Sequence, residues 1–246
     1  MNKLLISLLS VLLIFCVLVF SITINSFKDK KFTCNKYLLN TYLYILLTFN
    51  ILAIMMLSME YKKVNFRPNF LVFIGIFLLS LGCIFAIHAI DSEQVLLKHL
   101  VWLTFVLLLG LIFYPMYSSV PDKKMIISAI ITTLSLVLVL SAFAYAKPEY
   151  ISLSWGPVLL MLLIGVIIFE LITLIIMGFT KSYNSMLLRG ISYFVIFLFM
   201  GFILYDTKRL QINAKACVKA DYIKESLSLF LDIFNIFVRI LGLNMR

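Results

Sequence analysis

The residues best suited to chemistry in this chain form a stripe of polar side chains within its last hydrophobic run. Ser228, Asp232, Asn235 and Arg239 follow one another at spacings of four, three and four residues. Because an α-helix turns once in about 3.6 residues, this spacing predicts one polar face on an otherwise apolar helix. The face is narrow and poorly charged, which argues against a helix lying on the membrane surface. We therefore expect the stripe to face the interior of a bundle, or water.

A further carboxylate, Asp206, closes the hydrophobic run that precedes this helix. Taken alone, it would be interpreted as a boundary residue solvated by lipid headgroups. If the last two runs pack as antiparallel helices, however, Asp206 and Asp232 can meet inside the bundle. Two adjacent carboxylates do not both ionise readily, so such a pair would share one proton and sense pH. Its ionised form, with Asn235 and backbone or water oxygens, would be a weak calcium site.

Other ionisable residues within the hydrophobic runs are few, and each needs a partner because an isolated charge in a bilayer is costly. Glu170 lies deep in its run. We expect an intramembrane partner for it, or a protonated carboxyl bonded to a nearby Ser or Thr. On the second interpretation, Glu170→Gln would leave the fold intact. His88, Lys98 and His99 lie toward the ends of their runs, where a long side chain can reach the headgroups.

The composition places the protein in a membrane. Of its 246 residues, 63% are hydrophobic and 13% are charged, and the mean hydropathy is +1.11. A soluble domain is about half apolar and a quarter charged, and a chain of this length has no core large enough to bury the excess. The formal net charge is +10, but the Lys and Arg residues lie in short loops between hydrophobic runs. This pattern favours contact with membrane lipids rather than nucleic acid.

The cysteines give little further information. Cys16 and Cys83 lie within hydrophobic runs, whereas Cys34 and Cys217 lie in polar loops. The sequence has no CxxC spacing and no His close enough to a Cys to suggest zinc. We therefore expect no disulfide framework and no cofactor.

Eight hydrophobic runs are long enough to cross a bilayer, for which about 20 helical residues are required. Because alternation with period two is missing and a lipid-exposed backbone must bond to itself, the runs are predicted to be helices. The predicted ranges are Leu4–Ser26, Leu38–Met59, Phe70–Ile90, Leu96–Ser118, Met125–Ala146, Leu153–Gly178, Leu188–Asp206 and Ile223–Leu243. Short loops between them indicate an all-α, polytopic membrane bundle, with the last helix at or near its centre.

The chain is expected to divide into residues 1–37, an N-terminal hydrophobic helix with a basic loop, and residues 38–246, a seven-helix membrane domain. The first helix has features of a signal peptide, but it is long for one and lacks a small-residue cleavage site, which favours a retained helix. The two densest basic clusters, 28–36 and 208–219, fall on one side of the membrane if every run spans it. We expect this to be the cytosolic side.

The C-terminal third resembles a known family. The segments 202–207 (FILYDT), 221–223 (DYI) and 227–237 (LSLFLDIFNIF) share the order, aspartates and aromatic placement of the Bax inhibitor family signature. The seven runs from Leu38 onward are similar in number to the seven-helix core of that family. The resemblance covers about residues 38–243 and is strongest from Gly201.

This resemblance implies a pH-sensitive calcium leak, with anti-apoptotic activity in eukaryotic and viral members and an aspartate pair, here Asp206 and Asp232, as the sensor. Lys208 and Arg239 depart from the family pattern, in which neutral polar or apolar residues are usual. Their charge could hold the pair ionised and closed or weaken calcium entry, and Arg239→Leu would then raise the flux. The implied location is the endoplasmic reticulum or Golgi membrane in a eukaryotic or viral setting, and the cytoplasmic membrane in a bacterium.

Other functions remain open at this point. A non-conducting regulator of the same fold could act through helix–helix contacts with apoptosis-related membrane proteins. Catalysis is not expected, because the sequence contains neither HExxH nor GxSxG, nor the Gly-x-Gly-Asp half of the intramembrane aspartyl protease pattern. A seven-helix receptor is disfavoured because the DRY and NPxxY motifs do not occur.

Overall fold

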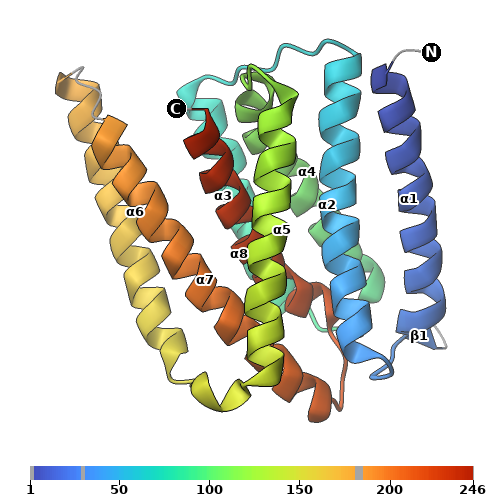
Figure 1. The fold of residues 1–246 in the computed structure, drawn as a ribbon. Helices are drawn as coiled ribbons and strands as arrows, with labels where there is room; N and C mark the ends of the chain where they lie inside the picture. The colour runs from blue at the N-terminus through green and yellow to red at the C-terminus, as the bar shows by residue number, and fades with distance from the viewer. Residues whose placement is uncertain (1–2, 29–30, 181–184, 246) are drawn as a thin grey trace. The chain divides into compact units, whose positions relative to one another are not determined.

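The computed structural model describes residues 3–28, 31–180 and 185–245, and Figure 1 shows it as a ribbon. Within these residues the chain forms eight α-helices, each long and apolar enough to cross a membrane. A two-stranded hairpin and one short 3-10 turn complete the described elements. The predicted all-α polytopic bundle with an additional N-terminal helix is therefore confirmed.

The elements follow the hydrophobic runs. The helices are α1 (Lys3–Ser26), α2 (Tyr37–Tyr61), α3 (Phe70–Ala89), α4 (Val95–Ser118), α5 (Lys123–Ala146), α6 (Trp155–Thr180), α7 (Ser185–Lys215) and α8 (Tyr222–Asn244). Strands β1 (Phe27–Lys28) and β2 (Lys31–Phe32) pair antiparallel after α1, and the 3-10 turn η1 (Pro148–Tyr150) follows α5. Seven of the eight predicted ranges agree with the observed bounds to within two residues.

Helix α7 is the exception, because it continues well beyond the end of its hydrophobic run. We predicted its end at Asp206, whereas the helix runs to Lys215. At about 1.5 Å per residue it is longer than the ~30 Å hydrocarbon core, so a polar end extends past the apolar part. Asp206 therefore lies inside a continuous helix, and only 7% of its surface is exposed. The interpretation of Asp206 as a solvated boundary residue is wrong.

The described chain divides into two compact units. The first comprises Met1–Ser119 with Ala214–Leu227, and the second comprises Val120–Asn213 with Ser228–Arg246. The connection between α7 and α8 thus belongs with α1 to α4, whereas most of α7 and α8 belongs with α5 and α6. The predicted division at residues 37 and 38 follows a different criterion and stays a prediction.

Within the first unit, α2 contacts both α1 and α4, and α3 contacts α4; α1 and α2 run side by side in Figure 1. Within the second unit, α6 packs against α7 through small residues. Gly156 lies beside the Tyr205 ring, where an added Cβ would come within 2.7 Å of the hydroxyl oxygen, and Gly201 lies beside Leu159. Small residues allow helices in a membrane to approach closely, and these contacts hold α6 against the part of α7 that precedes Asp206.

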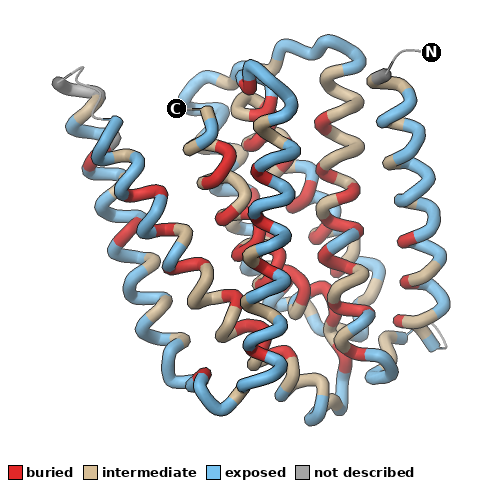
Figure 2. Tube along the Cα trace, in the orientation of Figure 1, coloured by how far each residue is buried: buried red, intermediate tan, exposed pale blue. Residues whose placement is uncertain are grey.

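Helix α8 is the most buried of the eight described helices. In its candidate membrane span 56% of the residues are buried, compared with 6% in α1 and in α6. Figure 2 shows the same contrast along the chain. The apolar side chains exposed on α1 and α6, such as Leu13 and Met161, suit contact with lipid tails. The alternative of a last helix lying flat on the membrane surface is wrong.

Candidate functional site: a buried aspartate pair

The two predicted aspartates meet in the second unit. Asp206 lies nine residues before the end of α7, and Asp232 lies ten residues after the start of α8. Antiparallel helices with these offsets carry the two residues at nearly the same level. Both side chains are buried, with 7% and 5% of their surface exposed. Their carboxyl groups lie close enough to interact with each other.

Arg209 completes this pair, and its role was not anticipated from the sequence. Its Nη1 lies 3.4 Å from Asp206 Oδ1, one helical turn away on α7. Its Nη2 donates a 3.0 Å hydrogen bond to Ser228 Oγ, one turn before Asp232 on α8. The guanidinium thus connects α7 to the polar stripe of α8. The sequence does indicate the contact between Asp206 and Arg209, because residues three apart on a helix are neighbours.

Asp232 is less completely partnered than Asp206. Its Oδ2 atom is buried and has no hydrogen-bond partner among the described residues, whereas Arg209 reaches Asp206. Burial of an unpaired carboxyl oxygen is unfavourable unless a proton or a cation approaches it. The pair therefore presents an unsatisfied oxygen beside the positive charge of Arg209.

The remaining polar stripe of α8 is divided between different partners. Asn235 Nδ2 donates to the backbone oxygen of Leu231 on the same helix. Arg239 contacts Glu170 on α6, with Nη1 2.5 Å from Oε1 and Nη2 2.8 Å from Oε2. Such two-point contacts between a guanidinium and a carboxylate are among the strong ion pairs in proteins.

These contacts correct two expectations from the sequence. The expected intramembrane partner of Glu170 is Arg239 rather than a Ser or Thr. The positive charge beside the aspartates is Arg209, and not Lys208 or Arg239. Lys208 Nζ instead donates to the backbone oxygen of Ile151. The sequence could not show which helices face each other, and this decides the partners.

A second polar cluster lies in the first unit, at the connection between α7 and α8. Cys34 and Cys217 form a disulfide with a Cα–Cα distance of 5.9 Å. The Tyr222 hydroxyl donates to the backbone oxygen of Thr33 and accepts from Asn40 Nδ2 at 3.1 Å. The expectation that the cysteines would form no disulfide is wrong, because two distant polar loops lie together at this end of the unit.

Lys98 also belongs to this cluster. Its side chain is fully buried and forms an ion pair with Asp221, and its Nζ donates to the backbone oxygen of Ile90 at 2.9 Å. Asp221 Oδ1 accepts from the backbone N–H of Lys224 at 3.1 Å, in the first turn of α8, as N-terminal capping residues do. The expectation that Lys98 reaches the headgroups is wrong, because its partner Asp221 lies on the connection between α7 and α8.

Lys219 links the same connection to the loop between α3 and α4. Its Nζ lies 2.6 Å from Asp91 Oδ1 and 3.6 Å from Glu93 Oε1. The backbone N–H of Glu93, and then Lys219, hold the pKa of Asp91 below its ordinary value of 3.8. The hydrogen bond with Asp91 raises the pKa of Lys219 above its ordinary value of 10.5. Both groups therefore keep their charge throughout the neutral pH range.

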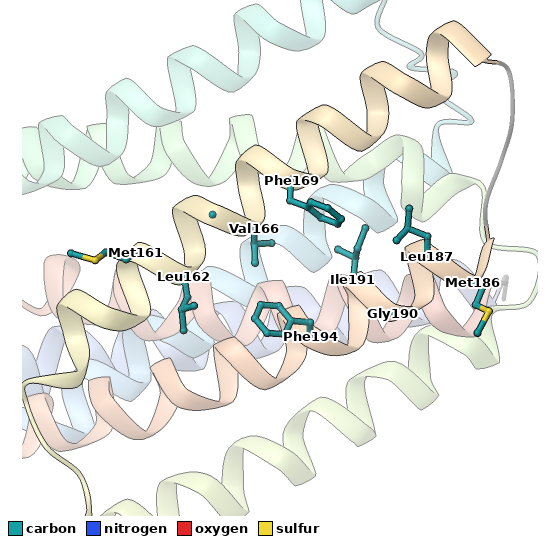
Figure 3. Close-up of a pocket in the computed structure, with 10 residues that line it drawn as sticks. Met161, Leu162, Val166, Phe169, Met186, Leu187, Gly190, Ile191 and Phe194 are labelled. Atoms are coloured by element: carbon teal, nitrogen blue, oxygen red, sulfur yellow. The ribbon is translucent and has the colours of Figure 1, made fainter.

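The second unit contains an apolar groove. It has a volume of about 770 Å³, lies between α6 and α7 and is drawn in Figure 3. Leu162, Val166, Phe169, Ile191 and Phe194 are among its lining residues, none of which is ionisable. The groove therefore provides no acid, base or cation ligand. Among the described residues, no group of three or more His, Cys, Asp or Glu could hold a metal ion.

Comparison with known proteins identifies the family. A family model described as inhibitor of apoptosis-promoting Bax1 matches residues 34–245. This range contains the pair Asp206 and Asp232, and it also contains Asp221 and Tyr222. A comparison with curated proteins gives no match. Because the family model covers far more than half of the chain, and eight helices suit a bilayer, the chain is a multi-pass integral membrane protein that belongs to the Bax inhibitor family.

Proposed function

We propose that this member of the Bax inhibitor family is a pH-sensitive calcium leak whose passage of ions is controlled by Asp206 and Asp232. The observation that carries the proposal is the close approach of two buried carboxyl groups, one of which keeps a buried oxygen without a partner among the described residues. Family membership supports the same function.

The chemistry follows from the number of protons on the pair. Two carboxyl groups bond to each other only when at least one of them holds a proton. Loss of that proton leaves two negative charges side by side, which repel each other and attract a cation. A change of protonation thus changes both the contact between α7 and α8 and the local charge. Two carboxyl groups that interact closely titrate as one unit rather than as two independent acids.

Two carboxylates suit the transient binding that conduction requires. Calcium prefers six to eight oxygen ligands, and two carboxyl groups with water or backbone oxygens would provide a weak site. An ion that is held weakly can leave again, as permeation demands. Arg209, 3.4 Å from Asp206, opposes cation occupancy and so limits the leak.

The cellular role that we propose is modulation of calcium homeostasis or apoptosis, with membrane lipids and calcium ions as partners. The membrane would be the endoplasmic reticulum or Golgi in a eukaryotic or viral setting, and the cytoplasmic membrane in a bacterium. We propose no enzymatic activity. Neither Asp206 nor Asp232 lies in the Gly-x-Gly-Asp pattern of intramembrane aspartyl proteases. A change in the protonation of the pair requires no substrate.

Calcium flux into proteoliposomes tests the proposal directly. The purified protein should admit calcium at a rate that changes between pH 6 and 8, whereas liposomes without protein should not. If the protein conducts no calcium at any pH in this range, the proposal is wrong. The function would then be that of a non-conducting regulator that acts through helix–helix contacts with apoptosis-related membrane proteins.

A further inference from the structure

The disulfide between Cys34 and Cys217 connects two segments that are 183 residues apart in the sequence. Cys34 lies between the β1–β2 hairpin and α2, and Cys217 lies in the short connection between α7 and α8. The bond therefore ties that connection to the start of α2 within the first unit. Among the described residues, the other two cysteines, Cys16 and Cys83, are free.

The bond is positioned for attack by a thiol. Cys34 is exposed, and Val218, next to Cys217, is 96% exposed. Lys36, Lys215 and Lys219 flank the two cysteines in the sequence and are also exposed. Nearby positive charge stabilises a thiolate, and a more stable thiolate is a better leaving group in disulfide exchange. Both access and local charge thus favour reduction.

The expected side of the membrane gives the bond a regulatory rather than a permanent character. From the basic clusters at 28–36 and 208–219 we expect this end of the protein on the cytosolic side by the positive-inside rule; Lys30 of the first cluster lies outside the described residues. Cytosolic disulfides are usually transient and redox-sensing, because the surrounding thiol pool is reducing. A disulfide between two accessible cysteines on the cytosolic side would be a redox-sensing disulfide of this kind.

Reduction would release the connection without dismantling the unit around it. Tyr222 would still donate to Thr33 and accept from Asn40. Lys98 would still pair with Asp221. These contacts hold the start of α8, whereas Ala216–Ala220 has the disulfide and the exposed contact of Lys219 with Asp91 and Glu93. The reduced protein is therefore expected to stay folded, with a looser connection between α7 and α8.

We propose that Cys34 and Cys217 form a redox-sensitive clasp on the connection between α7 and α8. In the reducing direction, a glutathione thiolate attacks one sulfur and forms a mixed disulfide, releasing the other cysteine as a thiolate that takes up a proton. A second glutathione thiolate then attacks the glutathione sulfur of the mixed disulfide and displaces the first cysteine, which also takes up a proton. Two electrons and two protons are transferred in total, giving two cysteine thiols and glutathione disulfide.

Opening of the clasp also bears on the aspartate pair, and this consequence rests on the proposed function. The connection joins the helix that carries Asp206 to the helix that carries Asp232. Because the connection is continuous with both helices, greater mobility of the connection would alter the positions of α7 and α8. Calcium flux is therefore expected to differ between the oxidised and the reduced protein.

The test uses full-length protein with Cys16→Ser and Cys83→Ser, so that only the clasp cysteines remain. Thiol counting after incubation with glutathione at a cytosolic ratio should show the bond opening, and a glutathione disulfide buffer should close it. An impermeant maleimide should label the reduced cysteines from the cytosolic face of membrane vesicles. Amide hydrogen exchange in residues 214–221 should be at least tenfold faster after reduction, while that of α2 should not change.

The additional variant Cys34→Ser, Cys217→Ser should exchange at the rate of the reduced protein and should not respond to reductant. The proposal is overturned if the bond resists the cytosolic glutathione ratio, if labelling occurs only from the opposite face, or if exchange is equal in both states. The bond would then be a permanent structural link. Exchange that responds to reduction without any calcium flux would leave the clasp standing and refute the leak instead.

Discussion

Glu170 and Arg239 form an ion pair between α6 and α8, with two contacts of 2.5 and 2.8 Å. Both residues are within membrane-spanning helices and are only about a quarter exposed. A charge left alone in this position has no water to replace its partner, so each residue depends on the other. The pair thereby fixes α6 against α8 within the second unit.

Loss of either charge of this ion pair should destabilise the protein. Glu170→Gln should lower the free energy of unfolding by about 3 kcal/mol, because Arg239 would remain charged in the bilayer without a counter-ion. This replaces the expectation that the variant would be neutral. The double variant Glu170→Leu, Arg239→Leu should regain most of the stability, since a well-packed apolar pair can substitute for a buried ion pair. Thermal unfolding in detergent provides the measurement. Equal stability of Glu170→Gln and the wild type would contradict the ion pair.

Arg209 should limit the calcium flux by repelling cations from the aspartates. We expect Arg209→Gln to raise the flux about fivefold, corresponding to about 1 kcal/mol of electrostatic repulsion between nearby charges. Lys208→Gln is the matched control, because the neighbouring lysine donates to a backbone oxygen instead. Arg239→Leu should not raise the flux through charge, since that guanidinium is engaged by Glu170. A larger effect of Lys208→Gln than of Arg209→Gln would contradict this assignment.

Lys98 and Asp221 should stabilise the start of α8. Lys98→Met removes the positive partner of a carboxylate that is 19% exposed, and should lower the free energy of unfolding by about 3 kcal/mol. Lys98→Met with Asp221→Asn should be less destabilised, because the amide is neutral and its oxygen can still accept from the backbone N–H of Lys224. Thermal unfolding of the two variants against the wild type gives the comparison. If the double variant is the less stable one, the pair does not act in this way.

The contact between Lys219 and Asp91 should be insensitive to pH in the neutral range. The pKa of Asp91 is lowered from 3.8, so its stabilising contribution is present above this value and is lost only as the pH falls through the lowered pKa. The pKa of Lys219 is raised from 10.5, so its contribution is present below 10.5 and is lost as the pH rises through the raised pKa. The stability difference between wild type and Asp91→Asn should thus be constant from pH 6 to 8 and vanish in strong acid. A difference that changes between pH 6 and 8 would show that another group titrates with this contact.

The sequence predicted most of the helices because long apolar runs separated by basic loops leave few alternatives in a bilayer. The sequence also predicted that Asp206 and Asp232 lie close together. Consecutive helices joined by a short connection run antiparallel, and the two aspartates lie at similar distances from this connection. The end of α7 was missed because hydropathy detects where apolar residues stop, whereas backbone hydrogen bonding continues into Lys215.

The remaining contacts could not be predicted because they join segments that are distant in the chain. Lys98 and Asp221, and Glu170 and Arg239, are each on helices or connections whose adjacency no local pattern specifies. The same holds for Cys34 and Cys217, which lie 183 residues apart. For Arg209 a local signal existed, since it is three residues from Asp206, but a helix surface carries many such pairs and most have little effect.

The measurement that tests the aspartate pair most directly is calcium flux through Asp206→Asn and Asp232→Asn between pH 6 and 8. An amide can copy the shape of a protonated carboxyl but does not titrate in this range, so each variant should stay folded and conduct at a rate independent of pH. His88→Gln and His99→Gln serve as controls, because they replace the two histidines of the chain, and both should keep the wild-type pH dependence. Wild-type pH dependence in both aspartate variants, or its loss in a histidine variant alone, would contradict control of the leak by Asp206 and Asp232.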